Sequence, residues 1–544
     1  MKIKNQIENW NSENFLEKYL KSCGVKNPTK YLATEKIKYQ NPLEYPNIDK
    51  AVDLFHKHLI NGDKFGVVVD CDVDGFLSAT AIVELLKTFK ANYVLFFHKG
   101  KEHGLSEDII EEVRGANLDL LIIPDAACNT NIGVDTLVLD HHRIENGNLG
   151  DNIVIVNPYL DREKRLNTAL SGTGVTAKFI EAFCKNSQIK LPYLTDLVAV
   201  SIIADVCDMT SEENRKYVSE GLCDIRNEML KSMFILLSGT EHSAKVVGWQ
   251  IAPKINALIR TVDERMATVF SAFLGEYEPR KAINILKDAY DKQTAQVNEA
   301  LKNIQINAEH NIVVGYIPKI YKAYTGLIAN KLLNKYGDKP IVVLRNETTD
   351  TYIGSLRSDI PLTDILNESG LCTAQGHDNA AGLTIDKENI TAFFEFADKN
   401  ITLENGDDDE TTEVTATIPE INSFDNSLCK TLTKHKDLWA NNIKEPTFYC
   451  EFDISKDDIA IYQKATTTIK FNTPTVSFVK FRASKGLVSG IENADYFHAK
   501  VISTLSGSEY EGFTQYQGYV SVIELTPITK PKADLDFSSF FSDN

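Results

Sequence analysis

Carboxylate and imidazole side chains follow several apolar runs of this sequence, at the points where we expect strands to end. One run, residues 137–139, stops at Asp140-His141-His142, and another, residues 66–69, stops at three aspartates at alternate positions. The candidate ligands at such ends are Asp70, Asp72, Asp74, Asp125, Asp140, His141, His142 and Asp205. Because parallel strands bring their carboxyl ends to one edge of a sheet, these side chains are predicted to meet there.

Such a set of side chains predicts a metal site. Many carboxylates at one edge would repel one another unless cations lay between them. Aspartate and histidine without cysteine suit divalent ions such as Mn²⁺ or Mg²⁺. More than four ligands favour two ions, and a two-ion site activates water and stabilises in-line displacement at phosphorus. A single aspartate at a strand end is more often a turn or helix cap, so the prediction depends on the whole set.

Helical patterns separate the apolar runs and indicate the elements that position the ligands. Five apolar strands, near residues 66–69, 93–97, 118–123, 137–140 and 153–156, alternate with helices or loops. Continuous apolar strands predict a parallel sheet covered on both faces, so the fold class is α/β. A second α/β unit begins near residue 311, and short alternating strands after about residue 411 predict a small barrel or sandwich.

Length and composition limit the class of protein. A chain of 544 residues is expected to form three or four domains. We expect no membrane span and no signal peptide, because no long apolar run is present. The nine cysteines are scattered without a Cys-x-x-Cys pair, which fits a cytoplasmic protein. The net charge of −18 argues against a uniformly basic surface, but a local cationic groove remains compatible with it.

Four motifs, in this order, resemble those of the DHH phosphoesterase superfamily: residues 70–75, Pro124-Asp125, Asp140-His141-His142 and Ala204-Asp205-Val206. Further matches narrow the resemblance to the RecJ single-strand exonuclease family. They are Asn157-Pro158, residues 170–175, Glu213-Asn214-Arg215, residues 253–257, residues 354–358, Gly376-His377 with residues 380–383, and residues 439–448. The similarity spans about residues 60–525. The Asp-His-His motif alone is a weak signal, whereas the ordered set is highly specific.

The resemblance implies a DHH phosphoesterase lobe with a parallel sheet, a long helical connector, a smaller DHH-associated α/β lobe and a β-rich, OB-fold-like barrel. The predicted segments are an N-terminal helical extension (1–60), the DHH catalytic domain (61–235), the connector (236–310), the DHH-associated domain (311–402), an acidic linker (403–415), the OB-fold-like nucleic-acid-binding domain (416–528) and a flexible acidic tail (529–544).

The resemblance also implies an activity: metal-dependent removal of 5′ mononucleotides from single-stranded DNA, 5′ to 3′, in DNA repair, recombination or replication. Two divalent ions are expected, Mn²⁺ in preference to Mg²⁺. The matched metal ligands are Asp70, Asp72, Asp74, Asp125, His141 and Asp205. His142 is expected to contact the scissile phosphate and Asp140 to orient a histidine; with Asp205 they form the catalytic set. Matched phosphate or DNA contacts are Lys99, Lys101, Ser171, Asn256, Arg260, Ser355, Arg357 and His377.

Departures from the family pattern concern substrate preference more than catalysis. Val68 stands where some relatives carry a further metal-binding histidine. A lysine, at position 99 or 101, replaces an arginine that the family often uses to bind the 5′ phosphate. A lysine cannot form the bidentate hydrogen bonds to phosphate that an arginine forms. Aromatic candidates for base stacking on the barrel are Phe448, Tyr449, Phe471 and Phe478, although their strand spacing favours a core position.

Two other functions remain open: a DHH phosphodiesterase for short RNA or cyclic dinucleotides, and a non-catalytic replication scaffold. The barrel-like segment and the connector argue against the first, and the intact ligand set argues against the second. Single-stranded DNA is the expected partner, with a single-strand-binding protein or a helicase as candidate protein partners. The acidic, aromatic segment 530–544 is either a docking segment or a solubilising tail.

Overall fold

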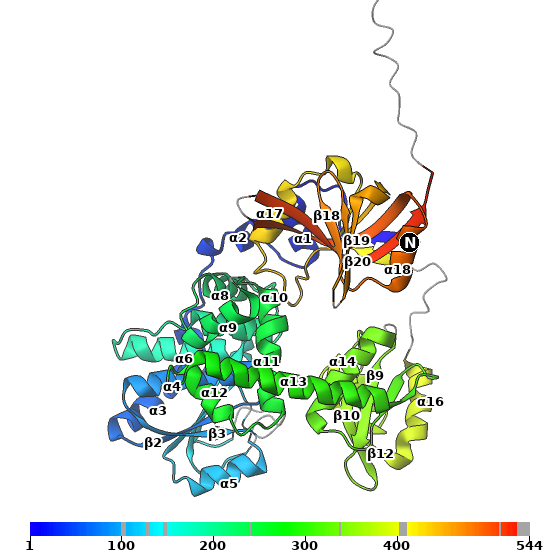
Figure 1. The fold of residues 1–544 in the computed structure, drawn as a ribbon. Coiled ribbons are helices and arrows are strands. Elements are labelled where there is room, and N and C mark those ends of the chain that lie inside the picture. The colour runs from blue at the N-terminus through cyan, green and yellow to red at the C-terminus, as the bar shows by residue number, and fades with distance from the viewer. Residues whose placement is uncertain are drawn as a thin grey trace, which may run out of the picture. The chain divides into compact units, whose positions relative to one another are not determined.

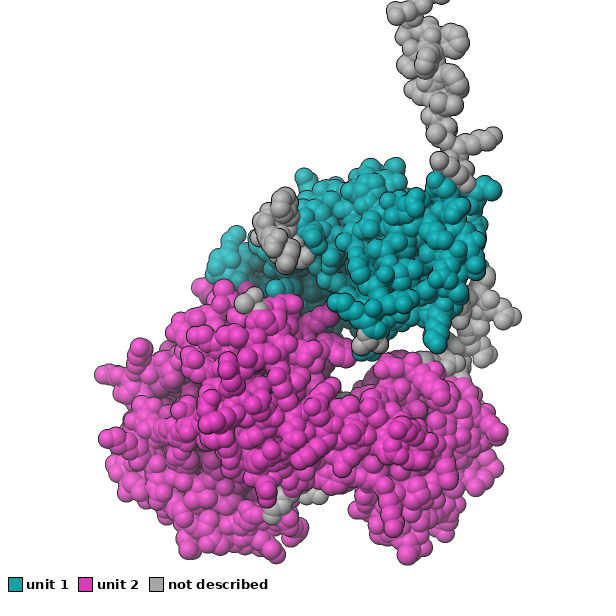
Figure 2. All heavy atoms as spheres, in the orientation of Figure 1, with its two compact units in different colours: residues 1–37, 208–215, 407–544 teal, residues 38–207, 216–406 magenta. Residues whose placement is uncertain are grey.

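The computed structural model describes residues 1–98, 105–126, 128, 130–144, 149–239, 241–336, 339–401, 411–464, 466–510 and 513–529. Two compact units are present (Figure 2). The first combines residues 1–37, 208–215 and 407–544, and the second combines residues 38–207 and 216–406. Within the described ranges, we find no helix with the length and apolarity needed to cross a membrane.

A five-stranded parallel sheet forms the centre of the second unit's first lobe, as the sequence predicts. Its strands are β2 (Lys64–Val69), β3 (Asn92–Phe97), β4 (Leu120–Pro124), β5 (Asp135–Leu139) and β6 (Ile153–Val156). Their spatial order is β3-β2-β4-β5-β6, and every neighbouring pair is parallel. The carboxyl ends of β2, β4 and β5 therefore lie next to one another.

Helices cover both faces of this sheet (Figure 1). Three of them pack against one face: α3 (Ile48–Asn61), α4 (Val73–Thr88) and α6 (Gly172–Asn186). On the other face, α5 (Glu107–Gly115) buries Ile109 and Val113 against Val68 and Ile123. Burial of strands on both faces explains why they are apolar at consecutive positions rather than at alternate ones.

The element before Asp205 differs from the expectation. Residues Thr195–Ala204 form helix α7, so Asp205 follows a helix and not a strand. This helix packs on α4 and α6, and residues 197–203 are all buried. A helix buried on every side has no polar stripe, and its apolar run therefore looks like a buried strand in the sequence.

Helices follow up to residue 303, as predicted for the connector. They are α8 (Glu212–Cys223), α9 (Glu228–Ser238), α10 (Ala244–Val246), the π-helix η5 (Val247–Ile251), α11 (Ala252–Arg260), α12 (Met266–Phe273) and α13 (Pro279–Asn303). The longest is α13, with 25 residues. The chain enters the second lobe directly after it, with the short strand β7 (Gln305–Asn307).

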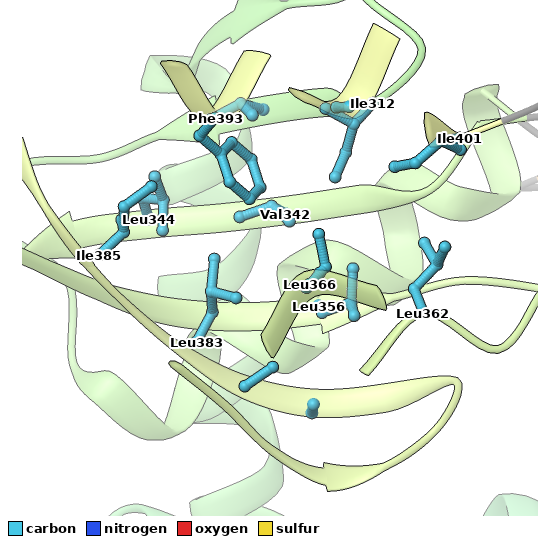
Figure 3. Packing of buried hydrophobic residues seen from close by; sticks show 14 residues of the cluster. Ile312, Val342, Leu344, Leu356, Leu362, Leu366, Leu383, Ile385, Phe393 and Ile401 are labelled. Carbon is cyan, nitrogen blue, oxygen red and sulfur yellow. The ribbon is translucent and has the colours of Figure 1, made fainter. Parts of the chain in front are cut away.

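A six-stranded mixed sheet forms the second lobe, in the order β11-β12-β10-β9-β8-β7. The remaining strands are β8 (Val313–Tyr316), β9 (Ile341–Asn346), β10 (Thr351–Arg357), β11 (Cys372–His377) and β12 (Ala380–Asp386), and the helices are α14 (Thr325–Tyr336), α15 (Thr363–Glu368) and α16 (Ile390–Asn400). Figure 3 shows the core on one face, where Leu356, Leu383 and Phe393 are buried. His377 lies at the end of β11, just before the predicted turn.

A seven-stranded sheet dominates the first unit, in the order β14-β15-β19-β20-β18-β17-β16. Its strands are β14 (Ala416–Ile418), β15 (Phe448–Ser455), β16 (Ile459–Gln463), β17 (Thr467–Asn472), β18 (Ser477–Lys480), β19 (Tyr496–Tyr510) and β20 (Phe513–Pro527), with helices α17 (Ser427–Lys434) and α18 (Lys485–Glu492). The predicted β-rich region is confirmed. Phe448, Tyr449, Phe471 and Phe478 are buried, which confirms that they belong to the core.

The N-terminal extension contains more than the predicted helices. Besides α1 (Phe15–Ser22) and α2 (Pro28–Leu32), it has a strand, β1 (Lys2–Asn5). This strand pairs in parallel with β13 (Thr411–Val414), so part of the predicted linker is ordered as a strand. Residues 402–410 of that linker, and the tail from residue 530 onward, lie outside the described residues. The pairing of β1 with β13 joins segments that are far apart in the sequence, which no local pattern could predict.

Candidate metal centre

The predicted ligands converge at the carboxyl edge of the parallel sheet. Three groups have candidate ligand atoms within 4.8 Å of one another: Asp74 with His141 and Asp205, Asp70 with Asp72 and Asp125, and Asp125 with His141 and His142. The shared members Asp125 and His141 make these groups one continuous cluster. All six residues matched to metal-ligand positions, and His142, belong to it, whereas Asp140 belongs to none of the three groups.

His141 stands among three carboxylates. Its Nε2 atom lies 3.2 Å from Oδ1 of Asp125, 3.6 Å from Oδ2 of Asp205 and 4.0 Å from Oδ2 of Asp74. Two ligand atoms about 2.1 Å from one octahedral ion, at right angles, are about 3.0 Å apart. These separations therefore suit ligands that share an ion.

Burial and mutual repulsion make the carboxylates costly to ionise. Burial, followed by the charges of Asp74 and Asp72, raises the pKa of Asp125 well above its usual range. Burial and the charge of Asp74 raise the pKa of Asp205 to about 7. Cations between the carboxylates remove this penalty, because each ion replaces repulsion with attraction.

The hydrogen-bond pattern fits divalent cations. Oδ1 of Asp125 and Nε2 of His141 are buried, and neither atom has a hydrogen-bond partner in the described part of the chain. Buried polar atoms are nearly always satisfied, so two such atoms facing each other indicate a missing ligand between them. Carboxylates with one imidazole are a donor set for Mn²⁺ or Mg²⁺. The residues present therefore fit the implied ions.

Backbone geometry holds Asp125 in an unusual position. Its φ of +59° lies in the left-handed region, which non-glycine residues seldom adopt. Gly172 packs directly against it: a Cβ at position 172 would lie 2.2 Å from Oδ1 of Asp125. Gly75 packs in the same way against Asp70, with a hypothetical Cβ 2.4 Å from the aspartate's own Cβ. The two glycines allow the ligand-bearing segments to approach.

The amino end of α6 binds an anion, but that anion is part of the protein. The backbone N–H groups of Gly172 and Thr173 each donate to Asp74 at 2.7 Å, and the Thr173 hydroxyl donates to Oδ1 at 2.5 Å. Ser171 is fully buried, caps the helix at the Gly174 N–H and contacts the Ser201 hydroxyl at 2.7 Å. The expected contact of Ser171 with DNA is therefore wrong, because Asp74 already occupies this helix end.

A second histidine is oriented beside the cluster. Nδ1 of His142 lies 2.7 Å from Oδ1 of Asp140, and the side-chain amide of Asn157 donates to Asp140 at 3.3 Å and to the His142 carbonyl at 2.9 Å. Burial lowers the pKa of His142, but the Asp140 carboxylate outweighs burial and raises it to about 9. The histidine that Asp140 orients is thus His142, which leaves Nε2 as its outward-facing donor.

Two arginines from different lobes of this unit interact electrostatically with each other, and one of them also with Asp72 of the cluster. Burial lowers the pKa of Arg260, and the charge of Asp72 opposes that shift. Burial, followed by the charge of Arg260, lowers the pKa of Arg357. Oδ1 of Asn256, one helical turn before Arg260, is buried without a hydrogen-bond partner among the described residues. Two neighbouring guanidinium groups favour an anion between them.

The second lobe supplies the surroundings of Arg357. Its guanidinium would lie 2.7 Å from a Cβ at position 326, so it packs against the amino end of α14. The hydroxyls of Ser355 and Thr325 are 2.8 Å apart at the same helix end. The sequence analysis names Ser355 and Arg357 as phosphate contacts, which stays a prediction, and does not name Thr325, which lies beside Ser355. Lys99 and Lys101 lie outside the described residues, as does the side chain of His377.

Comparisons with known proteins agree with this architecture. Residues 64–202 match the family model of the DHH family, N-terminal domain, and residues 309–403 match the DHHA1 domain. The chain is 28% identical over 585 residues to the putative SPbeta prophage-derived single-strand DNA-specific exonuclease YorK of Bacillus subtilis, covering 97% of this chain and 99% of the relative. It is 21% identical over 395 residues to the single-stranded-DNA-specific exonuclease RecJ of Escherichia coli, covering 64% and 67% respectively.

Solved structures show the same fold. RecJ from Thermus thermophilus in complex with Mn²⁺ matches with a TM-score of 0.71 at 19% identity, over 98% of this chain and 80% of that one. The Mg²⁺ complex of RecJ from the same organism matches with a TM-score of 0.68 at 18% identity, over 98% and 78%. The α/β fold thus contains one segment that matches a DHH domain and one that matches a DHHA1 domain. In fold, the whole chain is similar to RecJ.

Proposed function

We propose that this chain is a metal-dependent exonuclease that removes 5′ mononucleotides from single-stranded DNA in the 5′ to 3′ direction. The observation that carries the proposal is the convergence of five aspartates and His141 on one edge of the sheet. The names of its relatives as single-strand DNA-specific exonucleases support the same substrate. Such an activity would serve DNA repair, recombination or replication.

The chain's own residues account for the chemistry at the scissile phosphate. Bound divalent ions would supply an activated water and neutralise charge on the phosphate. Asp125 and His141, shared between the ligand groups, fix the spacing of the cluster. His142, oriented by Asp140, would donate from Nε2 to a phosphate oxygen and stabilise charge that develops during displacement. Removing Asp140 would free His142 to rotate, and this donor would be lost.

Direction would come from capture of the 5′ phosphate in the second lobe. Arg357, Ser355 and Thr325 gather at the amino end of α14, where N–H groups and the helix dipole favour an anion. Arg260 extends the positive charge toward Asp72. A terminal phosphate held there would place the next phosphodiester toward the ligand cluster. Arg357→Ala should therefore reduce the preference for 5′-phosphorylated over 5′-hydroxyl DNA about tenfold or more.

Strand binding would use an aromatic face of the seven-stranded sheet. Phe481 and Tyr519 stack with ring centroids 6.1 Å apart, and the Phe481 side chain is 57% exposed. The strand register puts Lys470 and Tyr462 on the same face as Tyr519. Exposed rings beside a cation suit single-stranded nucleic acid, because bases stack on rings and the cation contacts the backbone.

The test uses a single-stranded DNA oligonucleotide labelled in turn at each end, with Mn²⁺ and purified full-length protein. We expect the 5′ label to be released as a mononucleotide, while the 3′ label stays on progressively shorter strands. Asp140→Ala and His141→Ala should each abolish release. Addition of a chelator should do the same, and excess Mn²⁺ should restore activity.

Other results would replace the proposal. Binding of the strand without cleavage, in every divalent metal tried, would indicate a non-catalytic replication scaffold. Cleavage restricted to short RNA or cyclic dinucleotides would indicate a phosphodiesterase for small substrates. Pull-down with a single-strand-binding protein or a helicase, with and without residues 531–544, tests the proposed protein partners and the role of the tail.

A further inference from the structure

A third imidazole lies beside the metal centre, on a strand that carries none of the predicted ligands. His98 follows β3 and is only 1% exposed. Its Nε2 atom lies 3.4 Å from Oδ1 of Asp70. The His98 backbone N–H donates to the Val69 carbonyl at 3.3 Å, which fixes the end of β3 against the end of β2. The backbone at His98 is therefore anchored beside the strand end that leads to Asp70, and the ring is buried there.

The separation between His98 and Asp70 matches those inside the cluster. Nε2 of His141 lies 3.2 Å from Asp125 and 3.6 Å from Asp205, and the distance of 3.4 Å for His98 falls between these values. A neutral imidazole and a carboxylate at this spacing can both bind one ion, because cis ligands of an octahedral ion are about 3.0 Å apart.

Without His98, the ligand groups of the cluster differ in whether they contain an imidazole. One group contains His141 together with Asp74 and Asp205, whereas the group of Asp70, Asp72 and Asp125 has carboxylates alone. Val68, two residues before Asp70, cannot supply an imidazole, and its side chain is buried in the apolar core with Ile123 and Val138. Within the described part of the chain, His98 is an imidazole that lies against Asp70 of this group, at a distance that allows both side chains to bind one ion.

We propose that His98 is a metal ligand, providing through Nε2 the nitrogen donor of the ion held by Asp70, Asp72 and Asp125. This inference rests on the two-ion centre of the proposed function but not on the identity of its substrate. Nitrogen ligands favour transition metals over Mg²⁺, whereas an all-carboxylate site accepts both. His98 therefore makes this half of the centre selective for Mn²⁺.

The experiment measures metal binding directly on metal-free, full-length protein. Mn²⁺ and Mg²⁺ are titrated by calorimetry, and bound Mn²⁺ is examined by electron paramagnetic resonance for nitrogen modulation from imidazole. In His98→Asn, we expect the Mn²⁺ affinity of one of two sites to fall about tenfold or more, with a smaller loss for Mg²⁺ and weaker nitrogen modulation. His98→Gln should behave in the same way.

His58→Gln is the matched control. His58 is also buried in this lobe, and its ring nitrogens lie 2.8 Å from Asp63 and 2.9 Å from Asp135, near the opposite edge of the sheet. It should lower the melting temperature of the metal-free protein without changing Mn²⁺ affinity. Thermal melts in chelator, run for all variants, separate a loss of folding from a loss of a ligand.

Two results would overturn the assignment. If His98→Asn lowers the melting temperature in chelator but binds Mn²⁺ with unchanged affinity and nitrogen modulation, His98 has only a structural role beside Asp70. If the wild-type protein binds no Mn²⁺, the two-ion centre itself fails, and with it the metal part of the proposed function. A wild-type protein that binds two Mn²⁺ ions but cuts no DNA would leave the His98 assignment standing and remove only the exonuclease proposal.

Discussion

The Thr173 hydroxyl donates a hydrogen bond of 2.5 Å to Oδ1 of Asp74, and the Thr173 backbone N–H donates to the same oxygen at 2.7 Å. Burial raises the pKa of Asp74, while His141 and the Thr173 donors lower it. Thr173 thus helps to keep a buried carboxylate ionised and pointed at the ligand cluster, and it acts through Asp74. It is a positioning residue.

Replacing this donor should weaken metal binding. Thr173→Val keeps the shape but removes the hydroxyl, and loss of a hydrogen bond to a buried charged group costs about 1–3 kcal/mol. We expect Mn²⁺ affinity at pH 7 to fall about tenfold, with partial recovery at higher pH, where Asp74 ionises more readily. Calorimetric titration measures the change. Thr173→Ser, which retains the donor, should bind nearly as the wild type does; equal affinities in Val and Ser variants would contradict the role.

Gly172 is predicted to accept no side chain. A Cβ at this position would lie 2.2 Å from Oδ1 of Asp125, which real contacts essentially never show, so the ligand must move. We expect Gly172→Ala to reduce Mn²⁺ affinity and nuclease rate at least tenfold. The control is Gly115→Ala on α5, where no atom lies within 4 Å of the added methyl group. Normal metal affinity in the Gly172→Ala protein would contradict this prediction. It would show that the backbone at the amino end of α6 can shift enough to accommodate the added methyl group without displacing Asp125.

A partly buried carboxyl away from the metal centre should make stability depend on pH. Burial and the charge of Asp196 raise the pKa of Glu84 on α4 from 4.5 to about 7, while Lys87 opposes the shift. Since the folded-state pKa lies above the unfolded one, the protonated form favours folding. Its contribution is complete below about pH 4.5 and is lost as pH rises through about 7.

Thermal melts of metal-free protein at pH 5 and pH 8 test this relationship. Glu84→Gln, which mimics the protonated form, should raise the melting temperature by a few degrees at pH 8 and change it little at pH 5. The control is Glu111→Gln, an exposed position on α5. An equal shift at both pH values would mean that packing of the amide, and not the charge, is responsible.

Stacking on the exposed aromatic pair should contribute much of the strand affinity. Alanine at Phe481 or Tyr519 removes one ring of the stacked pair, and each base-stacking contact is worth about 1–3 kcal/mol. We expect single-strand affinity to fall about five- to a hundredfold in fluorescence anisotropy, measured in a His141→Ala background to prevent cleavage. Leu43→Ala, at an apolar side chain that is 52% exposed in the other unit, is the control. Unchanged affinity in both ring variants would show that this face of the sheet is not the binding surface for the single strand.

The sequence alone predicted the parallel sheet and the acidic and imidazole side chains that gather at its edge, because both follow from local patterns; their role as metal ligands stays a prediction. Consecutive apolar residues mark strands buried on two faces, and aspartate or histidine at their ends marks the edge where ligands gather. The order of the lobes was inferred from the resemblance of the motifs to those of the family. The same rule could have selected His98, since this imidazole also follows an apolar strand, β3. The sequence does not give the order of the strands in the sheet, however, so it did not show that β3 lies beside the strand that leads to Asp70.

Only the tertiary structure decided the relationships that depend on contacts between distant segments. It showed that Asp205 follows a helix, because a fully buried helix and a buried strand share an apolar pattern. It showed that the amino end of α6 binds Asp74, so Ser171 is a buried cap. It also paired β1 with β13 across most of the chain. Each of these depends on which surfaces meet on folding, and spacing along the sequence does not encode that.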